Sequence, residues 1–298
     1  MQLLFTILLD GLVYASYLFI VAAGLTIIFG VMKILNVAHG GFYAWGAYTA
    51  AYFIGSASEM GFPDWFGFLI IAGSALAVGI VLGLLIERIV LRRLYDHEEI
   101  LIVLATFGVF LILEDLILLI FGVNPYFAYQ PMVALGSVEM GGIFRDVYSL
   151  TLFGIALLVA AGSWWMLTRT RWGKLITAVI HDREMALIVG INVRRLFVVT
   201  FCAGAVLGAL GGAYIAPTVS VAPGFAVDVI VLSFAVVVIG GMGSIPGALI
   251  GALLVGLLRA LAVHKLPELE LFVIFLVMSA VLIVRPEGLF APAKARKI

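Results

Sequence analysis

The sequence is poor in charged residues, which make up 11% of its 298 residues, whereas 64% are hydrophobic. Soluble domains contain about 25% charged and about 45–50% apolar residues. So little polar sequence cannot cover the surface of a globule, which argues against a soluble enzyme, a nucleic-acid-binding protein and a disordered scaffold. We therefore expect the chain to lie in a lipid bilayer, with short loops and no sizeable extramembrane domain.

Several other features are absent or scarce. Cys202 is the single cysteine, so no intrachain disulfide can form. The 17 basic and 17 acidic residues cancel, which argues against a polyanionic partner such as nucleic acid. No Lys or Arg precedes Lys33, so the amino terminus lacks the basic segment of a signal peptide, and we interpret it as a retained membrane span. The sequence also has no Gly-x-x-x-x-Gly-Lys-Ser/Thr phosphate loop.

What is present is a series of long apolar segments, which predicts an all-α, polytopic membrane bundle of about eight or nine helices in a single domain, residues 1–298. The predicted spans are residues 5–31, 36–55, 66–87, 100–121, 149–168, 197–216, 229–242, 247–263 and 270–284. If one of the short, glycine-broken segments is re-entrant, the number of spans is even. This alternative stays open at the level of the sequence.

The basic residues indicate the orientation of these spans. With the amino terminus outside, 14 Lys and Arg residues lie inside, Arg145 and Lys265 lie outside, and Arg259 lies within a span. Because cytoplasmic loops carry the excess of basic residues, this arrangement is favoured. Residues 124–148 then form the longest outer loop, in which we expect a short surface helix.

Two glycine clusters interrupt apolar segments, and the chain has 33 glycines in all. Helix breaks in lipid persist where they line a cavity, and in transporters they occur in corresponding positions of two halves. We therefore predict that both clusters flank a translocation pathway. The predicted pathway residues are Asn36, His39, Gly40, Gly41, Gly46, Gly240, Gly241, Gly243, Ser244 and Gly247. Two alternatives stay open: small residues simply let helices pack closely, and His39 is a hydrogen-bonded histidine of the core. No residue near His39 has the spacing of a metal-binding site.

Three charged residues stand out inside predicted spans: Glu114 and Asp115 in the fourth, and Arg259 in the eighth. At ~1.5 Å per helical residue, Glu114 lies about 12 Å and Arg259 about 8 Å from the outer ends of their spans. Similar depth permits a buried ion pair, which we predict for these residues. The alternative is that one of the carboxylates couples transport to protons.

Residues 169–196 are the most polar and basic internal stretch. Asp182 is a suitable N-cap, Glu184 favours the positive first turn of a helix, and Gly190 can end one in the left-handed conformation. We predict a short helix here on the cytoplasmic face. Its apolar residues, of which Met185 is one, require some other surface to cover them.

These segments resemble a known family. The pattern Glu184-x-Ala186-x-x-x-Gly190 resembles the coupling loop by which permeases of ABC importers dock onto their ATPase subunits, although Met185 stands where the general pattern has alanine. Together with residues 24–40, 240–251 and 284–290, it resembles the shorter permease of the high-affinity branched-chain amino acid importer. The resemblance covers essentially the whole chain.

The resemblance implies a type II-like ABC importer permease, in the bacterial inner membrane, that transports leucine, isoleucine and valine. It implies four kinds of partner: a second homologous permease, two ATP-binding cassettes, an extracytoplasmic substrate-binding protein and membrane lipid. ATP and Mg would be bound by the cassettes, so the chain itself is expected to need no cofactor and to be no enzyme. The coupling residues it implies are Asp182, Arg183, Glu184, Met185, Ala186 and Gly190.

Other hypotheses remain. Relatives within the family carry other amino acids, urea or short amides. An ion-coupled secondary transporter would use Glu114 or Asp115 as its coupling carboxylate. An intramembrane enzyme has little support, because no nucleophile and base occur together in a recognisable motif.

Overall fold

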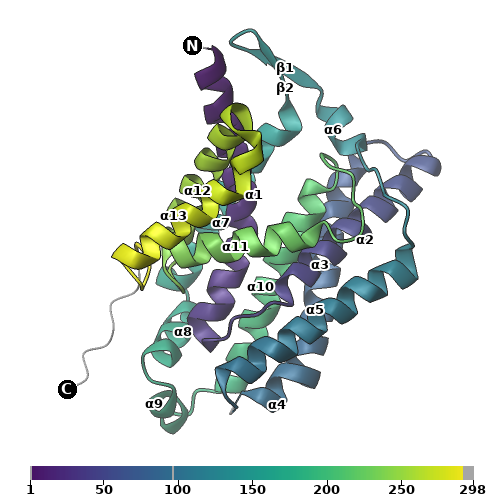
Figure 1. The fold of residues 1–298 in the computed structure, drawn as a ribbon. Coiled ribbons are helices and arrows are strands. Elements are labelled where there is room, and N and C mark those ends of the chain that lie inside the picture. The colour runs from purple at the N-terminus through teal and green to yellow at the C-terminus, as the bar shows by residue number, and fades with distance from the viewer. Residues whose placement is uncertain (1, 96, 291–298) are drawn as a thin grey trace.

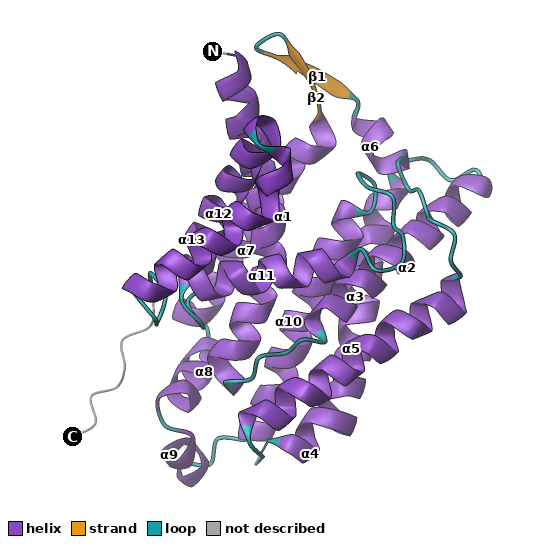
Figure 2. Ribbon diagram, in the orientation of Figure 1, coloured by secondary structure: helices purple, strands orange, loops and turns teal. Residues whose placement is uncertain are grey.

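The computed structural model describes residues 2–95 and 97–290, which fold almost entirely into helices (Figures 1 and 2). Within these residues, seven helical segments are long and apolar enough to cross a membrane. They are α1 (Gln2–Met32), α3 (Phe66–Ile86) with its continuation to Leu94, α5 (Glu99–Phe121), α7 (Val147–Arg169), α10 (Val193–Ile215), α12 (Ile245–Lys265) and Pro267–Val284, which contains α13 (Glu270–Val284). The predicted all-α, polytopic fold is confirmed.

Two further predicted spans are helical, but neither is both long enough and apolar enough to be counted with these seven. α2 (His39–Glu59) has 21 residues, but its glycines, serines and tyrosines make it less apolar. α11 (Ala226–Gly240) is apolar but has only 15 residues, or about 22 Å at ~1.5 Å per residue, which is shorter than the ~30 Å hydrocarbon core. Figure 1 shows α11 running across the bundle instead of along α1.

The centre of the bundle is formed by α1 and α10. In the most apolar 18-residue stretch of each helix, 78% of the residues of α1 and 61% of those of α10 are buried. The corresponding share is 17% in α7 and 6% in the segment that contains α13. Small residues allow this packing: a Cβ added at Gly24 would lie 2.5 Å from the backbone oxygen of Gly204. One added at Gly256 would lie 2.6 Å from that of Gly11. Close contact between backbones is the usual role of glycine in membrane helices.

The two ends of the bundle differ in charge. One end carries the start of α1, α6 (Gln130–Leu135) and the hairpin of β1 (Ser137–Met140) and β2 (Ile143–Asp146). The other end carries the basic elements α4 (Arg92–Leu94), α8 (Arg171–His181) and α9 (Arg183–Ile188), and α3 reaches it through a π-helical turn, η1 (Glu87–Leu91). This segregation agrees with the predicted orientation, in which the amino terminus is outside.

The outer loop contains the predicted short helix, α6, and also a hairpin that the sequence analysis did not predict. Its turn is formed by Gly141 and Gly142, whose φ angles are +64° and +81°. Two consecutive residues with positive φ are what a tight hairpin turn requires, and a Gly-Gly pair supplies them readily. On the same face, a short 3-10 turn, η2 (Pro267–Leu269), joins α12 to α13.

Candidate functional site

The first predicted break separates α1 from α2 and buries polar side chains. α1 ends at Met32, Lys33 has a φ of +58°, and residues 33–38 are not helical. Asn36 and His39 are fully buried. Neither polar atom of the Asn36 side chain, nor Nδ1 of His39, has a hydrogen-bond partner among the described residues. The break therefore places unsatisfied polar groups inside the bundle.

The backbone of this break is partly satisfied by α5. The Thr106 Oγ1 accepts a hydrogen bond from the Val37 N–H at 3.2 Å and donates one to the Val103 carbonyl at 2.9 Å. Freed backbone groups at membrane depth need such partners, because lipid offers none. Thr106, and not the unpaired Asn36 amide, therefore supports the backbone of the break.

His39 is wedged between α1 and α10. Its Nε2 lies 3.0 Å from the Val21 carbonyl oxygen, and a Cβ at either Gly24 or Gly208 would lie 2.9 Å from its Cε1. The glycines leave the space that the imidazole ring fills. His39 therefore agrees in part with the alternative of a hydrogen-bonded core histidine, but its other nitrogen, Nδ1, has no partner among the described residues.

Four buried hydroxyl groups that the sequence does not single out are also unpaired among the described residues: that of Tyr48 on α2 and those of three smaller side chains. Thr26 of α1, Thr200 of α10 and Ser233 of α11 are 1%, 2% and 0% exposed, and none has a hydrogen-bond partner. Buried polar groups are almost always paired, so unpaired ones indicate a place for water or a ligand. Burial reveals these hydroxyls, and the sequence alone does not show it.

The second predicted break, Gly241 to Ser244, is satisfied instead. The Ser244 Oγ accepts from the Gly247 N–H at 3.1 Å and caps α12. The carbonyls of Ile239 and Gly240 at the end of α11 accept hydrogen bonds from the N–H groups of Leu289 and Phe290, both at 2.9 Å. The segment after α13 thereby closes the end of α11.

The glycines of this second break serve close packing. Gly241 and Gly243 have φ angles of +103° and +87°. A Cβ at Gly247 would lie 2.8 Å from the carbonyl carbon of Gly240, and one at Gly30 would lie 3.3 Å from Cα of Gly243. The end of α1 therefore rests on the second break.

The glycines predicted beside the first break also lie elsewhere than expected. Gly40, Gly41 and Gly46 are inside α2, where they are buried against Ile230 and Phe110, against Leu113 and against Ala209 respectively. At these glycines the structure agrees with the close-packing alternative. A role of the ten predicted residues in transport stays a prediction, for which Asn36 and His39 carry the polar groups.

The predicted ion pair between Glu114 and Arg259 is wrong. Arg259 pairs with Glu270 of α13, and its guanidinium group lies 3.7 Å from the ring centroid of Tyr14. Among the described residues neither Glu114 nor Asp115 forms an ion pair. Similar depth did not bring the side chains together, because α12 packs on α1 and α13 whereas α5 packs on α2.

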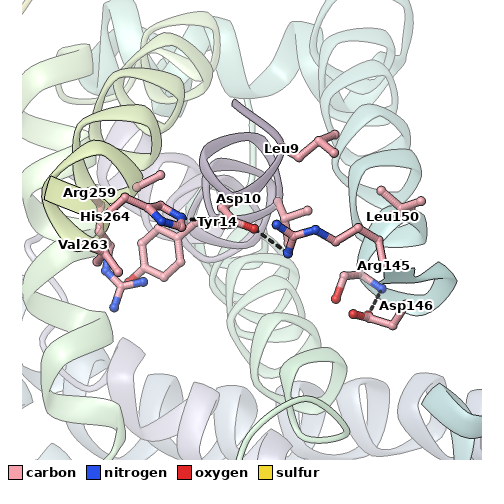
Figure 3. A pocket seen from close by; sticks show the side chains of 12 residues that line it. Leu9, Asp10, Tyr14, Arg145, Asp146, Leu150, Arg259, Val263 and His264 are labelled. Atoms are coloured by element: carbon pink, nitrogen blue, oxygen red, sulfur yellow. Dashed lines mark hydrogen bonds and ion pairs between the residues drawn. The ribbon is translucent and has the colours of Figure 1, made fainter. Parts of the chain in front are cut away.

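Arg259 lines a cavity of about 270 Å³ at the outer ends of α1, α7 and α12 (Figure 3). Asp10 bridges two basic side chains there: one of its oxygens lies 2.7 Å from Arg145 and the other 2.9 Å from His264 Nε2. Asp146 caps α7 through the Ser149 N–H. The charged groups of this cavity thus have partners, and they tie the hairpin to α1 and α12.

The predicted cytoplasmic helix is present as α9. The Asp182 carboxylate accepts from the Met185 N–H at 2.9 Å, Glu184 lies in the first turn, and Gly190 follows with a φ of +89°. Ala186 is buried, and the side chain of Arg183 lies outside the described residues. The large apolar side chains here that are more than half exposed are Met185, Leu187, Ile188 and Val189. We call these four residues the α9 patch.

Residues 7–282 match the model of a protein family described as the branched-chain amino acid transport system permease component. The chain belongs to this family. It is 27% identical to the high-affinity branched-chain amino acid transport system permease protein BraD of Pseudomonas aeruginosa, over 98% of this chain and 97% of that protein. It is 26% identical to the corresponding LivH protein of Escherichia coli, over 97% and 96%.

A more distant relative matches part of the chain. The fructose import permease protein FrcC of Rhizobium meliloti is 35% identical over 39% of this chain and 35% of that protein. The full-length matches confirm the family that the sequence pattern indicated.

Proposed function

We propose that this chain is the multi-pass permease subunit, in the bacterial inner membrane, of an ABC importer for leucine, isoleucine and valine. The observation that carries the proposal is the full-length similarity to permeases of branched-chain amino acid transport. ATP hydrolysis belongs to separate subunits, and the permease is no enzyme. The expected assembly has a second permease, two ATP-binding cassettes and an extracytoplasmic substrate-binding protein.

The α9 patch is the proposed contact with an ATP-binding cassette. Four apolar side chains, three on α9 and one directly after it, would be costly to leave in water at the basic end of the bundle. The Asp182 cap and buried Ala186 fix the helix on the bundle, so movement of a docked subunit would be transmitted to α8 and α10.

The polar groups around the first break are the proposed lining of the passage. A branched-chain amino acid has an apolar side chain and a zwitterionic end, for which neutral acceptors and donors such as Asn36 and His39 are suitable weak partners. Weak contacts suit a permease that receives its substrate from a binding protein, because tight binding in the passage would slow release. Neither Glu114 nor Asp115 is needed in this scheme.

The test is uptake of radiolabelled leucine by proteoliposomes that contain the permease pair and cassettes, with binding protein added on the outer face. We expect uptake to require enclosed ATP, to persist after ionophores abolish ion gradients, and to be inhibited by isoleucine and valine but not by fructose. Uptake that ignores ATP and stops with the ionophores would favour the ion-coupled alternative. Inhibition by fructose, urea or amides alone would overturn the proposed substrate.

Gly190→Val tests the docking role. A positive φ strains a β-branched residue by about 1–3 kcal/mol, and the open space around Gly190 excludes a steric clash. We expect folded protein that copurifies with less ATPase and takes up less leucine. Gly190→Asn is the matched control, because Asn tolerates the left-handed conformation. Equal copurification of both variants with the ATPase would count against the docking assignment.

A further inference from the structure

A second cavity, of about 640 Å³, opens at the basic end of the bundle between η1 and the start of α10. Its charged lining residues are Arg88, Arg92, Arg194, Arg195 and Glu87. Four guanidinium groups and one carboxylate give the cavity a positive charge. None of the residues assigned to transport or docking lies in it.

The four arginines have no carboxylate partner among the described residues. This is unlike the outer face, where both Arg145 and Arg259 are paired with acidic side chains. Like charges that line one cavity repel each other, and an anion between them removes that repulsion.

The start of α10 adds to the positive field. α10 runs for 23 residues from Val193, and its N-cap Asn192 accepts from the Arg195 N–H at 2.9 Å. The remaining N–H groups of the first turn and the positive end of the helix dipole lie beside Arg194 and Arg195. Phosphate is the anion that this combination of arginines and helix N–H groups recognises best.

Glu87 adds a polar acceptor to the cavity. Its side chain is 1% exposed, and its Oε1 accepts from the Tyr95 hydroxyl at 2.7 Å. Its Oε2 is buried without a hydrogen-bond partner among the described residues. A group that carries both a phosphate and a hydroxyl would satisfy the arginines and this oxygen together.

On its membrane side the cavity borders apolar surface. Val198 and Val199 on α10 both line the cavity, and Val199 is 42% exposed. Closer to the middle of the bundle α3 and α10 are held together, since a Cβ at Gly83 would lie 3.2 Å from Cα of Cys202. The surface beside the arginines is therefore suited to acyl chains. An acidic protein surface and free phosphate have no acyl chains, so this apolar surface favours a lipid over both.

We propose that the cavity formed by Arg88, Arg92, Arg194 and Arg195 binds the headgroup of an anionic glycerophospholipid of the cytoplasmic leaflet, such as phosphatidylglycerol. The arginines hold the phosphate, a headgroup hydroxyl donates to Glu87 Oε2, and the acyl chains lie along Val198 and Val199. Basic pockets between membrane helices on the cytoplasmic side are a recurring form of lipid site. This proposal does not depend on the transported substrate.

The test compares lipid retention by purified permease variants. Wild type, Arg88→Gln/Arg194→Gln and the control Arg93→Gln/Arg171→Gln are exchanged into equal mixtures of phosphatidylglycerol and phosphatidylcholine in mild detergent, and bound lipid is counted by native mass spectrometry. The control removes two exposed arginines from the same end of the bundle, outside the cavity. We expect about fivefold weaker phosphatidylglycerol preference per cavity arginine removed, and an unchanged preference in the control.

Two further arms distinguish the sources of phosphate and guard against misfolding. Inorganic phosphate and glycerol 3-phosphate at millimolar concentration should not displace the lipid, because they have no acyl chains. Arg88→Lys/Arg194→Lys should keep a preference for phosphatidylglycerol, because the positive charge remains. Three outcomes would each overturn the proposal. The first is displacement of the lipid by free phosphate, and the second is an equal loss of lipid in the cavity and control variants. The third is a cavity variant that keeps all of its lipid but no longer copurifies with the ATPase.

Discussion

The two helix breaks of this bundle contain similar residues but differ in how their polar groups are satisfied. Between α11 and α12, Ser244 caps the following helix, and the segment after α13 donates to the last carbonyls of α11. Between α1 and α2, the side chains of Asn36 and His39 are buried and have atoms without a partner in the part of the chain that the structure describes. The first break therefore leaves buried polar atoms unpaired among the described residues, as a passage for substrate would require, whereas the second is a closed structural joint.

This difference shows what glycine-rich segments do in the protein. Gly240, Gly243 and Gly247 let backbones touch, and they would do so whether or not anything passes nearby. The polar side chains that lack partners are the better guide to a passage. The comparison can be tested by changing each break separately, beginning with the largest expected effect.

Gly247→Val should have the largest effect, because the new side chain would collide with the backbone of Gly240 and separate α11 from α12. We expect a loss of at least about 4 kcal/mol in stability, and hence little folded protein, in a size-exclusion and thermal-unfolding assay. Gly162→Val is the control, since a Cβ there meets nothing within 4 Å. Equal yields of the two variants would contradict the close joint.

Asn36→Leu should have the opposite effect on stability. A buried polar group without a partner costs about 1–3 kcal/mol, and leucine has a similar shape without that cost. We expect an unchanged or higher melting temperature in purified permease. A clear decrease would mean that the Asn36 amide is paired in the folded protein and supports the break.

A pair of serines gives a smaller and matched comparison. Ser244→Ala removes an N-cap and should lower the free energy of unfolding by about 1 kcal/mol. Ser233→Ala removes a buried hydroxyl that has no partner among the described residues, so no loss of stability is expected. Parallel chemical denaturation measures both changes, and an equal loss in the two variants would remove the distinction between paired and unpaired hydroxyls.

The smallest effect is expected at the ion pair that joins α12, the helix after the second break, to α13. Arg259 and Glu270 are both more than a quarter exposed, so solvent screens their attraction and a coupling of about 0.2–1 kcal/mol is expected. A double-mutant cycle with Arg259→Gln and Glu270→Gln measures it. The same cycle with Glu114→Gln should give no coupling, and a larger coupling there would restore the pair predicted from depth alone.

The sequence predicts features that depend on neighbouring residues better than features that depend on packing. α9 could be predicted because Asp182 and Gly190 mark its ends by local chemistry. The hairpin has an equally local signal, because the adjacent Gly141 and Gly142 supply the two positive φ angles of its turn.

The partner of Arg259 could not be predicted, because depth along a helix does not say which helices are neighbours. The same holds for the candidate passage. Asn36 and His39 stand out as polar residues in an apolar sequence, but Thr26, Thr200 and Ser233 become notable only when the fold shows that they are buried and unpaired. The glycines alone do not distinguish a passage from a packed joint, because a helix break and a close contact between helices both use glycine.

The most direct test of the account compares the initial rates of ATP-driven leucine uptake by complexes that contain Asn36→Leu or Ser244→Ala, at equal amounts of folded permease. If the first break lines the passage, loss of a hydrogen bond worth about 1.4 kcal/mol in the transition state lowers the rate about tenfold in Asn36→Leu. Ser244→Ala, which weakens only the joint, should transport at the rate of the wild type. Wild-type uptake by Asn36→Leu together with impaired uptake by Ser244→Ala would contradict the account.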